Sequence, residues 1–414
     1  MDFNEYFSEK KIIQETFLSF LDNSIEEEED YRFQNLIKII LDKKITEDKL
    51  EFKILLNLIL KVTNNHYRLS NFYNKIKRIM HHFKNDIKLN FSNRELFNIF
   101  MVQRTLILIC IEEEIIVIDQ DIADYIKESA SIQYQCFLYP EIKQYLDDET
   151  SRKIQEKICD IQDFENKRKK GTNDSYICTL IQNDLIDEFV IHVNKNNINL
   201  SSNVNKSFFE SNKLLRNYIT NLINYASFYG SIQIFNYLRL NNVEMTDRTY
   251  LYAIHGNNPE IIHILEEYKI KCDYKECIKE SIKCHHNEMA SYFLELSNDQ
   301  FNHYISRKSL LNYNFSFVFK PANKNIEFFL LCRYGYYNLV NDILSENLVN
   351  VNYQATFEKR FWEYTLTPLT AAIGKKNVDI VKLLLSNKRT NVNLFAGIFK
   401  NKYFFSNYVS LLLY

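Results

Sequence analysis

The sequence predicts an all-α fold, in which an N-terminal helical domain precedes an α-solenoid of stacked helix pairs. Three observations predict this fold. Apolar residues recur at helical spacing over residues 1–165. A nine-residue pattern then recurs beyond residue 200. Glycine and proline are scarce, at six and four in 414 residues, while asparagine is abundant. Asparagine tolerates left-handed backbone, so it is expected to replace glycine in many turns.

The first region, residues 1–165, reads as a run of amphipathic helices. Two apolar faces follow helical spacing: Phe33, Leu36, Ile37, Ile40 and Leu41, and then Phe72, Ile76, Ile79 and Phe83. Ser92 followed by Glu95 predicts a capping box at a helix start. The acidic run Glu26–Asp30 is expected to be a solvated loop or a helix start.

The basic run Lys167–Lys170, followed by Gly171, marks the best candidate linker, residues 166–175. It carries charge and no apolar periodicity, and it contains one of the rare glycines. A solvated connector is the favoured interpretation. A nucleic-acid-binding or sorting patch is the alternative.

The repeated pattern indicates helix pairs. Its aligned starts are Gly230, Asn257, His285, Gly335 and Lys376. The first position is a turn residue, the fourth is polar or acidic, and the fifth, sixth and ninth are apolar. This order fits a turn that ends one helix, then a cap and an acidic first turn of the next. Asn258 before Pro259 is a clear cap of this kind.

A second short helix is expected upstream of each start. Ala226, Ala253 and Ala372 fall at similar places in these helices, where two helices must pack closely. A sixth, weaker unit is expected at Ile177–Val190. Each unit packs only on its neighbours, so the array is expected to be extended and to offer a large binding face.

The last unit, Thr367–Asn393, opens with Thr367-Pro368-Leu369 and contains the apolar outer helix Ile380–Leu385. It closes with Asn391–Asn393, and Asn350–Asn352 closes the preceding unit in the same way. This unit resembles an ankyrin repeat. Thr370 and Lys376 depart from the family, which usually has histidine and glycine there. The irregular spacing of the aligned starts, against ~33 residues in a regular array, indicates degenerate repeats.

The predicted organisation has five parts. They are a helical domain at 1–165, a linker at 166–175, degenerate ankyrin-like repeats at 176–300, an irregular insertion at 301–325, and C-terminal ankyrin repeats at 326–414.

The whole chain further resembles the large ankyrin-repeat family expanded in trichomonad protists, in which a helical region and a domain of unknown function precede ankyrin units. The stretches that carry this resemblance are Asn64–Arg68, Phe91–Phe100, Asn173–Cys178, Tyr252–Ile262 and Glu280–Asn287. The resemblance implies intracellular protein–protein binding.

The composition is that of a folded protein, with 46% hydrophobic and 25% charged residues. The formal net charge of -2 shows no basic excess that would direct the whole chain toward nucleic acid or an anionic membrane. The most apolar stretches, Phe52–Val62 and Phe97–Ile111, fall short of the ~20 residues that span a bilayer. The N-terminus lacks the apolar block of a signal peptide, and the eight cysteines show no obvious disulfide framework. We therefore expect a cytoplasmic protein without a membrane span.

No catalytic, cofactor-binding or metal-ligating residues are predicted. The spacing of the six glycines disfavours P-loop enzymes, standard dinucleotide folds and α/β-hydrolases. One cluster has metal-ligand residue types: Cys272, Cys277, Cys284, His285 and His286. Zinc sites prefer tighter pairs, so packed small cysteines beside a polar turn are favoured. The pair His81-His82 is expected on a helix surface.

One aromatic group lies in the long connection between the last two repeats. The predicted protein-binding residues are Phe357, Lys359, Arg360, Phe361, Trp362 and Tyr364, together with Lys375. Tryptophan, tyrosine and arginine are enriched among residues that dominate binding energy. The alternative is that this connection folds back and buries its aromatic side chains against the last repeats.

The predicted function is a non-enzymatic interaction module that binds a protein partner through the repeat surface. One alternative is a structural protein that oligomerises through its N-terminal domain. A second alternative is an unrecognised metal-dependent enzyme. The identity of the partner and the oligomeric state stay open.

Overall fold

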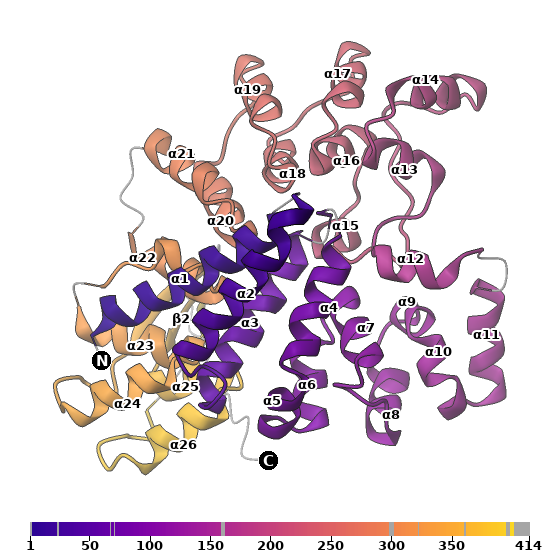
Figure 1. The fold of residues 1–414 in the computed structure, drawn as a ribbon. Helices are drawn as coiled ribbons and strands as arrows, with labels where there is room; N and C mark the ends of the chain where they lie inside the picture. The colour runs from indigo at the N-terminus through magenta and orange to yellow at the C-terminus, as the bar shows by residue number, and fades with distance from the viewer. Residues whose placement is uncertain are drawn as a thin grey trace. The chain divides into compact units, whose positions relative to one another are not determined.

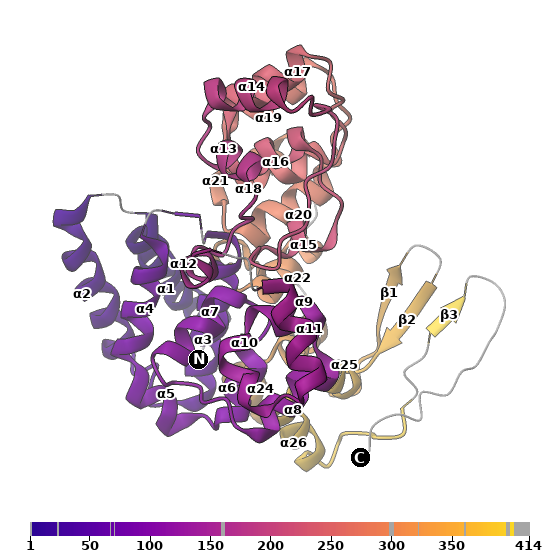
Figure 2. The same cartoon turned by 90° about the vertical axis from the view of Figure 1, so that its right-hand side faces the viewer.

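The computed structural model describes residues 2–22, 25–66, 68–69, 71–158, 162–297, 302–321, 323–359, 362–394 and 398–400. These residues contain 26 α-helices and very little sheet, which confirms the all-α, repeat-like fold (Figures 1 and 2). Within the same ranges, no helix combines the length and the apolar character that a membrane crossing requires.

The chain divides into two compact units. Unit 1 comprises Met1–Gln14, Leu50–Ile54 and Gln300–Tyr414, and unit 2 comprises Glu15–Lys49 and Leu55–Asp299. Most of the N-terminal helical region therefore shares unit 2 with the first repeats.

The helices before the repeats are mostly short. They are α1 (Phe3–Asp22), α2 (Glu26–Asp42), α3 (Lys49–His66), α4 (Phe72–His82), α5 (Lys84–Asn90), α6 (Asn93–Phe100), α7 (Arg104–Glu112), α8 (Gln120–Ser129), α9 (Ile132–Phe137), α10 (Tyr139–Ile142), the 3₁₀-helix η1 (Lys143–Tyr145), α11 (Asp148–Ile158) and α12 (Phe164–Lys170).

Local signals in the sequence explain several of these helices. Ser92 and Glu95 form the predicted capping box at the start of α6. The acidic run at residues 26–30 begins α2, as one of the two expectations had it. The predicted faces of α2 and α4 are buried except at Leu41, which is 49% exposed. Leu41 lies about 80° around the helix from Phe33, at the edge of the apolar stripe, so that assignment was wrong.

Six helix pairs follow, each with an inner and an outer helix. Unit 2 holds α13 (Tyr176–Gln182) with α14 (Ile186–Lys195), α16 (Leu222–Tyr229) with α17 (Ile232–Leu240), α18 (Thr249–Gly256) with α19 (Pro259–Glu267), and α20 (Tyr274–Cys284) with α21 (Asn287–Ser297); unit 1 holds α23 (Lys324–Tyr334) with α24 (Tyr337–Ser345), and α25 (Pro368–Gly374) with α26 (Val378–Ser386). The first pair is the weak sixth unit expected from the sequence.

The remaining elements lie between or after these pairs. They are α15 (Lys213–Asn217), α22 (Asn302–Asn312), the 3₁₀-helix η2 (Phe315–Phe317), β1 (Ala355–Lys359), β2 (Trp362–Leu366) and β3 (Ile398–Lys400).

In unit 2 the inner helices α13, α16, α18 and α20 contact one another in succession, and the outer helices form a second row (Figure 1). Ala226 and Ala253 are fully buried in α16 and α18, as their small size predicted. An added Cβ at Gly256 would overlap the carbonyl oxygen of Ser227. Glycine therefore permits the close approach of α18 to α16.

The turn between the two helices of a pair uses left-handed backbone. All five aligned starts have positive φ: 70° at Gly230, 48° at Asn257, 59° at His285, 92° at Gly335 and 58° at Lys376. This confirms that the first position of the repeated pattern is a turn residue. Asparagine, histidine and lysine take the place of glycine in three of these turns.

The residue after the left-handed position links one pair to the pair before it. Asn258 Nδ2 donates to the Gly230 carbonyl at 3.1 Å, and Asn377 Nδ2 donates to the Arg333 carbonyl at 2.9 Å. Ser231 Oγ bonds the Ile181 carbonyl in the same way. Each bond satisfies a carbonyl at the C-terminal end of the preceding inner helix, which has no partner within that helix.

The predicted linker begins inside helix α12, which spans Phe164–Lys170. Arg168 is fully buried there, and its guanidinium binds the carboxylates of Glu141 and Glu165. The ring of Phe137 lies 5.2 Å from the guanidinium carbon. The expectation of a solvated connector is therefore wrong for Arg168, because a carboxylate and an aromatic face stabilise its burial.

Unit 1 joins the start of the chain to its last third. Gln14 Nε2 donates to Asn314 Oδ1 at 3.2 Å, and Gln14 Oε1 accepts from the Phe315 backbone N–H at 2.5 Å. Glu51 accepts hydrogen bonds from the Tyr6 hydroxyl and from Asn338 Nδ2, each at 2.8 Å. Buried polar bonds thus connect segments that are far apart in the sequence.

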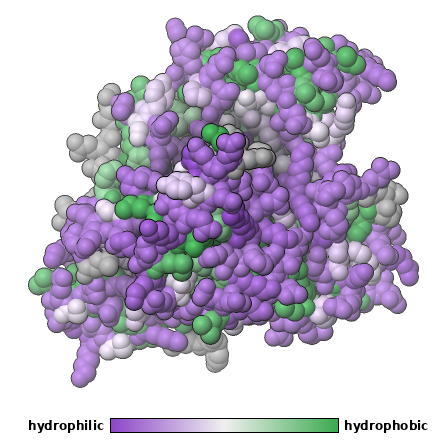
Figure 3. Space-filling model, in the orientation of Figure 1, coloured by the Kyte–Doolittle hydropathy of each residue, from purple (hydrophilic) through white to green (hydrophobic). Residues whose placement is uncertain are grey.

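The surface of the described residues is mainly polar on the face drawn in Figure 3, where hydrophobic residues form small groups. Several large exposed apolar side chains stand alone in the sequence, as at Tyr31 and Ile191. Single exposures of this kind are normal and mark no site by themselves.

Candidate functional site

The C-terminal repeat is built by local hydrogen bonds that its sequence dictates. The Thr367 side chain accepts from the Thr370 backbone N–H at 3.2 Å, and Thr370 Oγ1 accepts from the Thr367 N–H at 2.8 Å. Pro368 follows at the first helical position of α25. Threonine at 370 thus completes a capping box, so this departure from the usual histidine still stabilises the helix start.

The two asparagine-rich closing motifs tie neighbouring units together. The Asn350 backbone N–H donates to Asn325 Oδ1 at 2.8 Å, at the start of α23 in the same helix pair. The Asn391 N–H donates at 2.8 Å to Asn352 Oδ1, in the closing motif one unit earlier. Asn352 Nδ2 also donates to the Arg389 carbonyl at 2.8 Å. The repeated Asn-Val-Asn motif therefore has a structural role at the loop edge of this stack.

The connection between α24 and α25 contains an antiparallel β-hairpin. In the β1–β2 register Phe357 pairs with Tyr364, and Lys359 pairs with Trp362. Strand β3 pairs with the other edge of β2, so β2 is central and β1 is an edge strand among the described strands. Figure 2 shows the hairpin extending away from α25.

The hairpin brings four predicted contact residues to paired register positions. Register partners and residues two apart share one face of a hairpin, so Phe357, Lys359, Trp362 and Tyr364 occupy positions on the same face. Arg360 and Phe361 lie outside the described residues. The sequence had predicted a connection without strands. The alternation of Thr356 and Glu358 with Phe357 was the signal for a strand.

Lys375, the seventh predicted contact residue, lies after α25 and is exposed. Its ammonium is 6.0 Å from the centre of the Tyr334 ring. Partial burial and the neighbouring Arg333 hold the pKa of Lys375 below its usual range. This side chain therefore sits beside the two inner helices of the last pairs.

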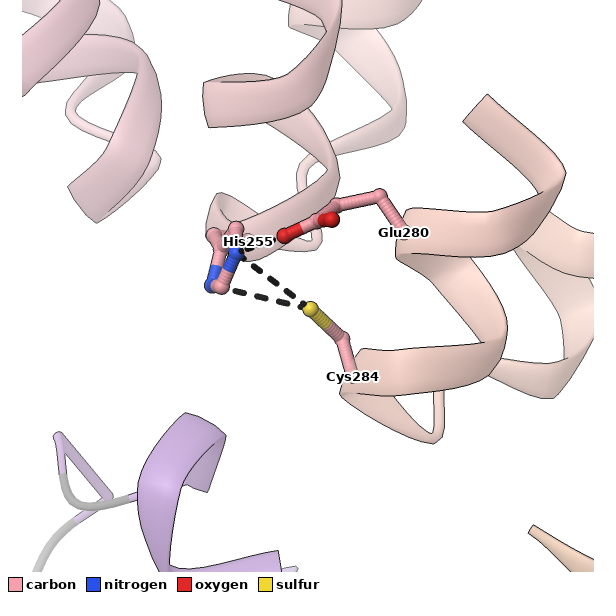
Figure 4. Close-up of side chains that lie close together, drawn as sticks. All are labelled: His255, Glu280 and Cys284. Carbon is pink, nitrogen blue, oxygen red and sulfur yellow. Dashed lines mark hydrogen bonds and ion pairs between the residues drawn. The ribbon is translucent and has the colours of Figure 1, made fainter. Parts of the chain in front are cut away.

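A second candidate site is a buried polar cluster in unit 2 (Figure 4). Glu280 and Cys284 are four residues apart on α20 and so share one face of that helix, opposite His255 at the end of α18. His255 Nε2 lies 2.7 Å from Glu280 Oε1, and Cys284 Sγ lies 3.6 Å from both ring nitrogens. The His255 side chain is fully buried, and that of Glu280 is 8% exposed.

The charges in this cluster are set by burial and by Lys283. Burial lowers the pKa of His255 to about 4. Burial alone would raise the pKa of Glu280, but the Lys283 ammonium and the bond from His255 hold it below its usual range. Burial also raises the pKa of Cys284. At neutral pH the cluster is a neutral imidazole, a carboxylate and a protonated thiol.

These three residues form the only group of potential metal ligands of its size among the described residues. The group supplies three ligands, whereas a structural zinc site has four. The thiol sulfur is equidistant from both ring nitrogens, and Glu280 already accepts bonds from His255 and Lys283. A buried, protonated thiol is also unsuited to nucleophilic catalysis.

Arg68, in the connection between α3 and α4, contacts His255 of this cluster. Its guanidinium donates to the carbonyl oxygens of Phe228 and His255, at the ends of α16 and α18. The guanidinium carbon also lies 4.5 Å from the centre of the Phe228 ring. A cation at helix C-termini is favoured by the helix dipoles and by the unpaired carbonyls.

Asn65 and His66, which precede Arg68 in the sequence, contact carbonyl oxygens at the end of the next inner helix, α20. A ring nitrogen of His66 lies 2.8 Å from the Cys284 carbonyl, and Asn65 Nδ2 donates to the Lys283 carbonyl at 2.9 Å. We call residues 65, 66 and 68 the carbonyl clamp. This clamp binds the C-terminal ends of three successive inner helices: α16, α18 and α20.

The sequence did not predict the clamp, although Arg68, His255 and Glu280 lie in stretches that carry the trichomonad resemblance.

The metal-type set Cys272, Cys277, Cys284, His285 and His286 is not one site, because Cys284 faces His255. His81 and His82 are exposed at the end of α4, as predicted. Three of the four basic residues at 167–170 pair with carboxylates: Lys167 with Asp174, Arg168 with Glu141, and Lys169 with Glu112.

Comparison with known proteins gives one finding. A protein-family model, the ankyrin repeat, matches residues 365–395. No curated protein and no solved structure matches the chain. The match covers the end of β2 and all of α25 and α26 with the closing asparagine motif, which confirms the ankyrin repeat predicted there. The resemblance of the whole chain to the trichomonad family stays a prediction.

Proposed function

We propose that this chain is a non-enzymatic binding protein that holds a protein partner on the surface of its C-terminal repeats. The ankyrin repeat at residues 365–395 is the observation that carries the proposal. Stacked helix pairs of this kind present an extended surface and commonly bind proteins. We expect this binding to take place in the cytoplasm.

The β1–β2 hairpin is the part of this surface that we propose as the contact. It stands between the last two helix pairs and extends from α25 (Figure 2). Four of the predicted contact residues share one face of it by register. An extended hairpin supports contact with a partner rather than the fold-back alternative.

The sequence at the hairpin suits a binding surface. Tryptophan, tyrosine and phenylalanine supply large contact areas at low cost in side-chain entropy. The basic residues Lys359 and Arg360 accompany them, and Lys375 adds a further positive charge nearby in the sequence. We therefore expect a partner with an apolar contact surface bordered by acidic residues.

The test begins with the full-length chain as bait in the native cell. Proteins captured by wild type are compared with those captured by the Arg360→Ala/Trp362→Ala double variant. A candidate partner is then purified and titrated against both chains. We expect the variant to lose at least about 30-fold in affinity, the equivalent of about 2 kcal/mol for a central aromatic residue. Tyr31→Ala, which removes an exposed aromatic side chain from α2, is the matched control.

Thermal melting separates contact from folding. Contact at the hairpin predicts an unchanged Tm for the double variant. A large drop in Tm would support the fold-back alternative, and equal capture by wild type and variant would exclude the hairpin as the contact.

A further inference from the structure

Two cysteines meet at the start of α20. Cys272 lies in the connection after α19, Cys277 lies in the first turns of α20, and their Sγ atoms are 3.6 Å apart. Asp273 is the N-cap residue between them, and its carboxylate accepts from the Glu276 backbone N–H at 3.1 Å. Cys272 thus precedes the cap, and Cys277 is the fourth helical residue. These two positions pack together at many helix starts, so the cap itself brings the two sulfurs into contact.

The two thiols have unequal surroundings. All seven cysteines in the described ranges are free thiols, and Cys272 is the one among them that is not buried. Cys277 is only 1% exposed. The hydrogen bond between the thiols lowers the pKa of Cys272 and raises that of Cys277. The carboxylates of Glu266 and Asp273 raise the pKa of Cys272 and so oppose the effect of this hydrogen bond. Reactive protein thiols are accessible and often stand beside a second cysteine that resolves the first oxidation product.

We propose that Cys272 and Cys277 are a modification site, at which a hydroperoxide oxidises the two thiols to a disulfide. The Cys272 sulfur attacks one oxygen of hydrogen peroxide, the O–O bond breaks, and a sulfenic acid and one water form. The Cys277 sulfur then attacks the Cys272 sulfur. The S–S bond forms, the S–O bond breaks, and the departing hydroxide takes the Cys277 proton as a second water. Two thiols and one peroxide therefore give one disulfide and two waters.

The surroundings favour hydrogen peroxide over an anionic disulfide as the oxidant. Glu266 and Asp273 surround Cys272 with negative charge. Hydrogen peroxide is small and uncharged, so these carboxylates do not repel it. Oxidised glutathione carries net negative charge at neutral pH and would be repelled.

The disulfide would tie the connection after α19 to the first turn of α20. The Tyr250 hydroxyl already bonds the Ile270 carbonyl in this connection at 3.4 Å. The cross-link would therefore fix the entry of the chain into the fourth helix pair. This inference is independent of the proposed binding function, because it concerns a different part of the chain.

The sequence permits a direct test by peptide mapping. Trypsin cleaves after Lys271, Lys275 and Lys279, so it separates the two cysteines onto the peptides 272–275 and 276–279. Full-length protein is treated with hydrogen peroxide, its remaining thiols are alkylated at low pH, and it is digested without reductant. We expect one linked pair of these peptides, which a dithiol reductant separates.

Two variants test the assigned roles. Cys277→Ser should abolish the linked peptides and leave a sulfenic acid on Cys272 that dimedone traps. Cys178→Ser, which removes a buried cysteine from α13, should leave the linked peptides unchanged. A free glutathione standard in the same tube reports the extent of oxidation.

The proposal is overturned if both cysteines are recovered as alkylated thiols when the glutathione standard is fully oxidised. The two residues would then serve only as packing at the helix start. Recovery of wild-type Cys272 as sulfinic acid, or linked to a different cysteine, would also overturn it.

Discussion

The guanidinium of Arg68 donates a hydrogen bond to the carbonyl oxygen of His255, 187 residues further along the chain. The same group also serves the end of α16, so one side chain satisfies the C-terminal carbonyls of two neighbouring inner helices. In unit 2 the N-terminal helical region is therefore part of what holds the repeats in register.

Arg68→Ala should strongly destabilise the protein. It removes two charge-assisted hydrogen bonds and the contact with the Phe228 ring, for a loss on the order of 3 kcal/mol. Arg68→Lys should recover part of this loss, because an ammonium keeps the charge without the planar fork. Chemical denaturation measures the difference. Arg152→Ala, at an exposed position of α11, is the control and should change stability by less than about 0.5 kcal/mol.

Stability should fall as the pH falls from about 6.5 toward 4. Burial lowers the pKa of His255 from 6.5 to about 4, so over this window the unfolded chain binds a proton that the folded chain does not. The full effect is about 3 kcal/mol. His66 and His286 act in the same direction, since burial lowers their pKa values also. The pKa of Glu280 is lowered in the folded state. Its contribution to the free energy of unfolding is therefore lost only as the pH falls below its unfolded pKa, near 4.5.

Chemical denaturation at several pH values measures how the free energy of unfolding changes with pH. His255→Gln keeps an N–H donor for Glu280 but cannot titrate, so it should flatten the curve. His263→Gln, at an exposed position on α19, should leave the slope unchanged. Equal slopes for wild type and His255→Gln would contradict the assignment.

Two glycine substitutions should have opposite effects. Gly256→Ala forces a Cβ against the Ser227 carbonyl and the Gly230 backbone, so it should cost about 2 kcal/mol or more. Gly374→Ala meets nothing within 4 Å at the end of α25, so it should be neutral or stabilise by up to about 1 kcal/mol. Each variant adds one methyl group to wild type. Thermal unfolding of the two variants therefore shows whether steric overlap or helix propensity sets the change in stability at each position.

Thr367→Ala should weaken the last repeat. It removes the side-chain acceptor of the capping box at the start of α25, at a cost of about 1 kcal/mol. Thr367→Ser retains the hydroxyl and should keep most of the stability. Hydrogen exchange at the first N–H groups of α25 measures the change locally, and equal protection in Thr367→Ala and wild type would contradict this role for the cap.

The features that the sequence predicted well are those with local causes. Thr367 and Pro368 start a helix through neighbours within four residues, and the left-handed turn at Asn257 follows from the residue itself. The carbonyl clamp has no such signal. Arg68 reads as a residue in a polar connection, and nothing in the spacing relates it to a carbonyl far along the chain. The hairpin was partly predictable. Polar and apolar residues alternate over residues 355–359, as in a strand, but the alternating stretch is short.

The bonds from Gln14 to Asn314 and from Asn338 to Glu51 join segments that are synthesised at very different times. Unit 1 combines residues 1–14 and 50–54 with residues 300–414, so residues 55–299 are synthesised before its last segment exists. At roughly 5–20 residues per second, that interval lasts on the order of tens of seconds. Residues 1–14, with Phe3, Tyr6 and Phe7 buried in the finished fold, lack their neighbours from residues 300–414 for all of it. The nascent chain therefore presents these apolar residues, a natural substrate for chaperones, until residues 300–414 are made.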